Sequence, residues 1–137
     1  MNEGDLRFLP TALLIGVGKI DLQHAALFQR LIQLKESFLN NGGLQAAEAD
    51  GLVQALREHY ATEEQLAGEI GMDFAAHTDD HRNMLQMISK ALSDGVEGRA
   101  DVFGTLRYIE YWFERHIAQD DKPLGECAVR QAGGAKL

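Results

Sequence analysis

Histidines and carboxylates in this sequence recur at spacings that place them together on one face of a helix. Glu63 follows His59 by four residues, and His81 follows His77 by four. Residues four apart lie on the same helix face, so each pair would present two metal-binding groups to one side. Glu64 lies five residues after His59, which turns it about 140° away from that face on a helix of about 3.6 residues per turn. We therefore expect Glu64 to face solvent.

The remaining candidate ligands lie toward the two ends of the chain. His24 comes three residues after Asp21, and His116 is followed by the acidic pair Asp120 and Asp121. Regular helical spacing from His116 favours Asp120, whereas Asp121 aligns with His116 only where the helix loosens at its end. The spacing alone leaves both aspartates as candidates.

The placement of the histidines indicates a metal site. A single histidine on an apolar helix face is more often an ordinary hydrogen-bonded core residue than a ligand. All five histidines of this chain fall on apolar stripes, which cover roughly three of every seven helix positions. Five independent histidines would do so only on the order of one to two times in a hundred. Burying so many polar groups without partners would be strongly unfavourable, and a bound metal would compensate them.

The number and types of candidate ligands indicate which metal. A structural zinc site closes at four ligands, usually including thiolates, whereas this chain offers five imidazoles and at least two carboxylates. Magnesium and calcium prefer oxygen ligands, while imidazole together with bridging carboxylate suits iron. Ferritin-like di-iron bundles use E-x-x-H pairs, and this sequence contains none. The ligand set therefore predicts a histidine-rich centre with two irons.

Four stretches with helical periodicity would position these side chains. They cover residues 21–39, 44–70, 73–92 and 99–118, with Asp21 and Asp73 as expected N-caps and residues 93–95 as the stop of the third stretch. No stretch alternates polar and apolar residues as a half-buried strand does. We expect an all-α fold, with an up-down-up-down four-helix bundle in residues 21–121. Residues 1–20 would form an N-terminal arm and residues 122–137 a tail or linker stub, within one domain of residues 1–137.

Composition and charge exclude several partners. The chain has 137 residues, with 13 Lys+Arg against 21 Asp+Glu and a net charge of -8. This balance repels phosphate backbones and anionic lipid heads, so we expect neither a nucleic-acid nor a membrane partner. The single cysteine, Cys127, cannot form an internal disulfide. The start Met1–Asp5 is acidic and the apolar run of residues 12–17 is too short to span a bilayer, so we expect a cytoplasmic protein.

Four motifs carry the candidate ligands. They are I-D-L-Q-H ending at His24, H-Y-A-T-E-E beginning at His59, H-T-D-D-H from His77 to His81, and W-F-E-R-H-I-A-Q-D-D from Trp112 to Asp121. In this order they make the sequence similar to the bacterial hemerythrins, within the hemerythrin-like domain family, over about residues 14 to 124. The resemblance implies a four-helix bundle around two irons, which are bridged by an oxygen atom and two carboxylates and bind O2 reversibly.

The resemblance also implies a role for each ligand. One iron would be bound by His77, His81 and His116 and the other by His24 and His59, with Glu63 and Asp121 bridging both. Three imidazoles, two carboxylate oxygens and one bridging oxygen fill six positions on the first iron, whereas the second has only five. The resemblance thus implies that O2 binds to the five-coordinate iron. Trp112, Phe113 and Ile117 would lie beside it, and Phe113 stands where the family commonly has leucine.

Three classes of function fit these expectations to different degrees. The first is O2 binding without catalysis, for storage, delivery or sensing, including as the sensor of a longer protein with a signalling output domain. The alternative is a di-iron enzyme that reduces peroxide or NO, which would need an electron donor and an open polar route to the site. The apolar stripes indicate no such route. A metal-free helical interaction module is the third class, and it predicts a colourless protein.

Overall fold

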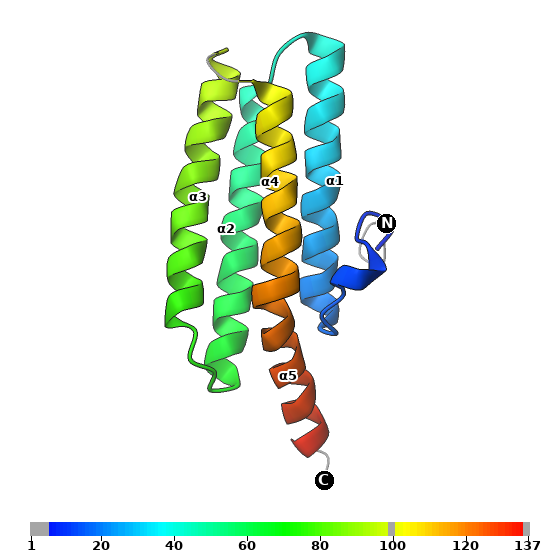
Figure 1. Ribbon diagram of the computed structural model, residues 1–137, viewed down its shortest axis with the longest axis vertical. Helices are drawn as coiled ribbons and strands as arrows, with labels where there is room; N and C mark the ends of the chain where they lie inside the picture. The colour runs from blue at the N-terminus through cyan, green and yellow to red at the C-terminus, as the bar shows by residue number, and fades with distance from the viewer. Residues whose placement is uncertain (1–5, 99–100, 136–137) are drawn as a thin grey trace.

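The computed structural model describes residues 6–98 and 101–135, and these residues form helices and turns without strands. The elements are a 3₁₀ turn (Thr11–Leu13), α1 (Gly18–Asn41), α2 (Ala46–Glu69), α3 (Ala75–Val96), α4 (Val102–His116), a π-helical turn (Ile117–Asp121) and α5 (Lys122–Ala135). In Figure 1, α1 to α4 run alternately up and down beside one another, and α5 continues the line of α4 beyond them. The predicted all-α four-helix bundle is confirmed.

The apolar stripes of the four helices meet in a layer that occupies one half of the bundle. α1 and α3 each pack against α2 and α4. The fully buried side chains of this layer are Leu31, Leu34, Leu52, Leu56, Ile88, Leu92, Leu106 and Ile109. Each contributes about 1.5–3 kcal/mol by leaving water. Because neighbouring helices run in opposite directions, the histidines fall together in the other half.

Three helix ends differ from the sequence expectation. α3 begins at Ala75 with Phe74, rather than Asp73, as its N-cap, although Oδ1 of Asp73 accepts from the amide of Ala75 at 3.2 Å. α1 begins at Gly18, with Val17 rather than Asp21 as its N-cap. The Asp21 carboxylate is instead buried and accepts hydrogen bonds from the backbone amides of Ile15 (2.9 Å) and Gly16 (3.2 Å). Asp21 therefore fastens the arm to the first turn of α1.

The third helix continues past its predicted stop at residues 93–95 and ends at Val96. Gly95 is buried where α3 passes close to Leu44, and an added Cβ would lie 3.2 Å from the Leu44 side chain. Gly95 therefore permits close packing rather than turning the chain. The left-handed conformation that follows the helix occurs at Gly98, whose φ is 77°.

The segment expected to be a tail is helical and packs on the arm. Leu124 of α5 is fully buried. Gly125 faces the arm so closely that an added Cβ would lie 2.1 Å from the carbonyl oxygen of Ile15. Some of the sequence expectations concern residues outside the described part of the chain. They are the acidic start in residues 1–5, the start of the fourth helix at Arg99 and the last two residues of the tail.

Within the described part of the chain, the helices are all too short or too polar to cross a lipid bilayer.

Candidate metal centre

The seven predicted ligands converge between the four helices in two groups that share both carboxylates. One group contains Glu63, His77, His81, His116 and Asp121, and the other contains His24, His59, Glu63 and Asp121. Within each group, one ligand atom from every residue lies within 4.8 Å of all the others, so each group could hold a metal ion. α1 supplies His24, α2 supplies His59 and Glu63, α3 supplies His77 and His81, and α4 with the π turn supplies His116 and Asp121.

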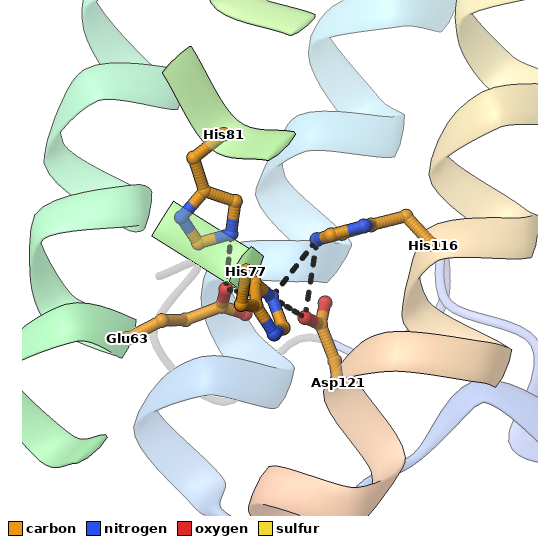
Figure 2. A group of neighbouring side chains, drawn as sticks. All are labelled: Glu63, His77, His81, His116 and Asp121. Carbon is orange, nitrogen blue, oxygen red and sulfur yellow. Dashed lines mark hydrogen bonds and ion pairs between the residues drawn. The ribbon is translucent and has the colours of Figure 1, made fainter. Parts of the chain in front are cut away.

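Glu63 directs one carboxylate oxygen to each group. Its Oε1 lies 3.0 Å from Nε2 of His81 and 3.7 Å from Nε2 of His77 (Figure 2). Its Oε2 lies 3.0 Å from Nε2 of His59 and 3.4 Å from Nε2 of His24. Two ligands about 2.1 Å from one ion and at right angles to each other lie about 3.0 Å apart. The spacing around Glu63 is therefore that of a carboxylate able to bridge two ions.

Asp121 is divided between the groups in the same way. Its Oδ1 lies 3.0 Å from Nε2 of His77 and 3.3 Å from Nε2 of His116, while its Oδ2 lies 3.1 Å from Nε2 of His24. Figure 2 shows Asp121 and Glu63 entering the centre from opposite sides, with the ring of His77 between their carboxylates and the rings of His81 and His116 above. Both carboxylates are completely buried.

The π turn explains why Asp121, and not Asp120, faces the imidazoles. The amide of Lys122 donates to the carbonyl of Ile117, five residues earlier, so the turn holds one residue more than an α-helical turn. Asp121 consequently points inward beneath His116. Asp120 stays at the edge of the bundle, where its Oδ2 accepts from Nδ1 of His116 at 2.9 Å.

Three of the five imidazoles have their second nitrogen held by an acceptor. Nδ1 of His59 lies 2.8 Å from Oε1 of Gln23, Nδ1 of His81 lies 3.1 Å from Oε2 of Glu64, and His116 has its contact with Asp120. Since each partner atom is an acceptor, Nδ1 carries the hydrogen and Nε2 keeps its lone pair for a metal. Glu64, which we expected to face solvent, therefore orients a candidate ligand.

The orientation of Gln23 is itself fixed by a short relay. The Thr62 hydroxyl donates to the backbone carbonyl of Glu58 (3.0 Å) and accepts from Nε2 of Gln23 (3.1 Å). The amide oxygen of Gln23 must then face His59. Gln23 was not singled out from the sequence, although it directly precedes His24 in the first motif.

Aromatic rings lie face to face with all three imidazoles of the larger group. The stacked pairs are Phe74 with His77 (4.0 Å between ring centroids), Tyr60 with His81 (3.9 Å) and Trp112 with His116 (4.6 Å). This stacking restrains ring rotation, which the hydrogen bond at Nδ1 alone does not. Phe74 was not singled out from the sequence, although it lies one helical turn before His77.

The electrostatics of the cluster favour bound cations. Burial raises the pKa of Glu63, but contacts with four imidazoles outweigh burial and hold that pKa well below its usual value. Burial likewise lowers the pKa of His24 and of His77, but Asp121 and Glu63 outweigh it and raise both pKa values to about 9. For His59 burial prevails and lowers the pKa.

Several buried ligand atoms have no hydrogen-bond partner among the described residues. They are both oxygens of Glu63, both oxygens of Asp121, both ring nitrogens of His24 and Nε2 of His81. Their short contacts with one another lack hydrogen-bond geometry, as expected when lone pairs converge on a common point. Unsatisfied buried groups of this kind are costly, and cations between them would satisfy all but Nδ1 of His24. The residues therefore fit a metal centre.

A small cavity adjoins the group with two imidazoles. The centre of a water molecule could occupy about 10 Å³ of this cavity. The cavity therefore has room for about one water molecule. Its walls are His24, His59, Asp121, His116, Leu27, Phe28, Leu56, Tyr60, Trp112, Phe113 and Ile117. The three residues expected beside the O2 site, Trp112, Phe113 and Ile117, all line it, and Phe113 packs edge to face on Phe28 with centroids 6.0 Å apart. We refer to this space as the inner cavity.

Comparison with known proteins agrees with this geometry. The family model described as hemerythrin HHE cation binding domain matches residues 15–128. Searches of curated proteins and of solved structures each found no match. The matched range contains every ligand candidate, both shared carboxylates and the π turn. This chain belongs to the hemerythrin HHE cation-binding domain family.

Proposed function

We propose that this protein is a non-haem di-iron protein that binds O2 reversibly, for oxygen storage, delivery or sensing, and is not an enzyme. The observation that carries the proposal is the position of the inner cavity. Four of the residues that line this cavity are candidate ligands. His24, His59 and Asp121 belong to the group with two imidazoles, whereas His116 belongs only to the larger group. Space for a small molecule thus lies beside the ligand group that has fewer imidazoles.

The contacts between the candidate ligands support the ligand roles that we propose. His77, His81 and His116 hold one iron, His24 and His59 hold the other, and Glu63 and Asp121 bridge them. Two ferrous ions in these positions would supply the two electrons that O2 takes up when it binds and returns when it leaves. Gln23 and Asp120 orient their imidazoles through Nδ1, as acceptors beyond the ligands do in other metal sites.

The walls of the inner cavity support binding rather than turnover. Apart from the candidate ligands, they are the aliphatic or aromatic side chains of Leu27, Phe28, Leu56, Tyr60, Trp112, Phe113 and Ile117. An apolar lining excludes water and limits proton entry, which preserves a reversible adduct. A di-iron enzyme that reduces peroxide or NO would require a polar entrance for protons, and the lining of this cavity does not favour that alternative.

The test is elemental analysis and optical spectroscopy of the protein reconstituted with ferrous iron without O2. We expect two irons per chain and a visible band that appears with O2 and disappears when O2 is removed. His77→Ala should abolish both, while Glu114→Gln, a change at an exposed residue of α4, should leave both unchanged. One iron per chain, preferential zinc binding in iron-rich medium, or a spectrum insensitive to O2 would refute the proposal.

A further inference from the structure

The side chain of Tyr60 combines two features that the proposed function does not use. It is 5% exposed, and its hydroxyl oxygen is buried without a hydrogen-bond partner among the described residues. A buried phenolic hydroxyl normally has a partner, because leaving one unpaired is costly. This cost indicates that the hydroxyl has a partner other than the described residues.

The surroundings of Tyr60 identify where that partner would lie. Tyr60 forms part of the wall between the inner cavity and a shallow surface depression near Arg57 and Glu64. Of these two spaces, the inner cavity is the more enclosed one, and it adjoins the candidate metal ligands. Among the described residues of its wall, Tyr60 alone carries a hydroxyl group.

We propose that Tyr60 donates its phenolic hydrogen to a small ligand held in the inner cavity and thereby favours ligands that carry negative charge or a strong acceptor atom. The inference rests on the proposed function for the identity of the natural ligand, dioxygen. The remaining walls that are not candidate ligands contribute mainly apolar contacts, which distinguish ligands by size but hardly by charge. A donor to a charged ligand makes a hydrogen bond that is stronger than one between neutral groups.

The substitution Tyr60→Phe isolates the hydroxyl. Phenylalanine keeps the ring that stacks on His81 at 3.9 Å, so the orientation of that imidazole and the iron content should be unchanged. Tyr108→Phe is the matched control, because Tyr108 is 52% exposed and does not line the inner cavity. Two readouts are needed, one on the metal-free protein and one on the iron-loaded protein.

In the metal-free protein, Tyr60→Phe should unfold at the same temperature as the parent or at a higher one, since it removes a buried hydroxyl that has no protein partner. Azide is the probe for the iron-loaded, oxidised protein. Its dissociation constant should rise about tenfold in Tyr60→Phe, as expected for losing a hydrogen bond to an anion. O2 should dissociate faster from the oxygenated form of Tyr60→Phe than from that of the parent. Tyr108→Phe should match the parent in every measurement.

Two results would overturn the inference. Azide affinity and O2 dissociation in Tyr60→Phe that equal those of the parent would show that the hydroxyl does not reach the ligand. A metal-free Tyr60→Phe protein that unfolds at a clearly lower temperature than Tyr108→Phe would show that the hydroxyl bonds to the protein. Failure of the proposed function is separate, because it would appear as missing iron or missing O2 binding in the parent itself.

Discussion

Gly125 offers a sharp test of how the arm and α5 are packed. In Gly125→Ala the new Cβ would lie 2.1 Å from the carbonyl oxygen of Ile15 and 2.8 Å from its Cβ. The oxygen is a backbone atom, and the Cβ is bonded to the same stretch of backbone. Asp21 holds this backbone through two hydrogen bonds, so the arm cannot shift freely. The arm must either leave α5 or strain against it.

The expected magnitude combines two opposing effects. Alanine is a better helix former than glycine by about 1 kcal/mol, whereas overpacking a filled contact costs about 1–3 kcal/mol and more where backbone is struck. We expect Gly125→Ala to lower the free energy of unfolding by about 1–2 kcal/mol. Gly68→Ala is the matched control, because Gly68 is also helical but an added Cβ would meet nothing within 4 Å. It should raise the free energy of unfolding by about 1 kcal/mol.

Urea unfolding of the two metal-free variants, followed by circular dichroism, measures both effects. With a urea dependence of about 1–3 kcal/mol per molar, the midpoints should move in opposite directions by several tenths of a molar. If Gly125→Ala proved as stable as Gly68→Ala, the arm would not be seated against α5 in solution and the packing described above would be incorrect.

Four further predictions concern the arm and the metal centre. Asp21→Ala should lower the free energy of unfolding by about 2 kcal/mol, because two arm amides lose their acceptor, and urea unfolding would show it; an unchanged midpoint would contradict the contact. Gln23→Leu should weaken metal binding about 10- to 100-fold in a chelator competition, since it removes the acceptor for an imidazole, and unaltered affinity would refute this role. Loading the metal-free protein with ferrous iron at pH 7.5 should release about two protons, because the pKa values of His24 and His77 are raised to about 9 and both imidazoles must lose a proton to bind metal. Calorimetry in buffers of different ionisation enthalpy counts the released protons. Their number should fall as the starting pH passes 9. Phe113→Leu should make the oxygenated protein autoxidise faster in air at fixed pH, since the buried ring excludes water from the inner cavity, and slower autoxidation would show that the ring admits water.

The features that the sequence predicted are periodic and local. His59 and Glu63, or His77 and His81, share a face because of helix geometry alone, and the apolar stripes required a bundle. The contacts that the sequence did not predict join different helices. Whether Glu64 reaches His81 depends on how α2 is rotated against α3, which the spacing within either helix does not determine.

The ends of the bundle were harder to predict for a different reason. Asp21 has the residue type and position of an N-cap, and only its two bonds to the arm show that tertiary contacts override that local preference. Residues 122–135 contain few strong apolar signals besides Leu124. Their helix is apparent only once α4 is seen to continue through the π turn.

The π turn at Ile117–Asp121 also shifts which side chains face inward along the otherwise continuous helix formed by α4 and α5. One extra residue rotates everything after it by about 100° relative to a regular helix. A single helical wheel drawn across α4 and α5 would therefore assign the wrong inward face to the second half, hiding both Asp121 and Leu124. When this extra rotation is included, the chain from the π turn into α5 turns one face toward the imidazoles and, a few residues later, another face toward the arm. The spacing between His116 and Asp121 thus sets the direction of α5 as well as the ligand geometry, and deleting one residue there should disturb both together.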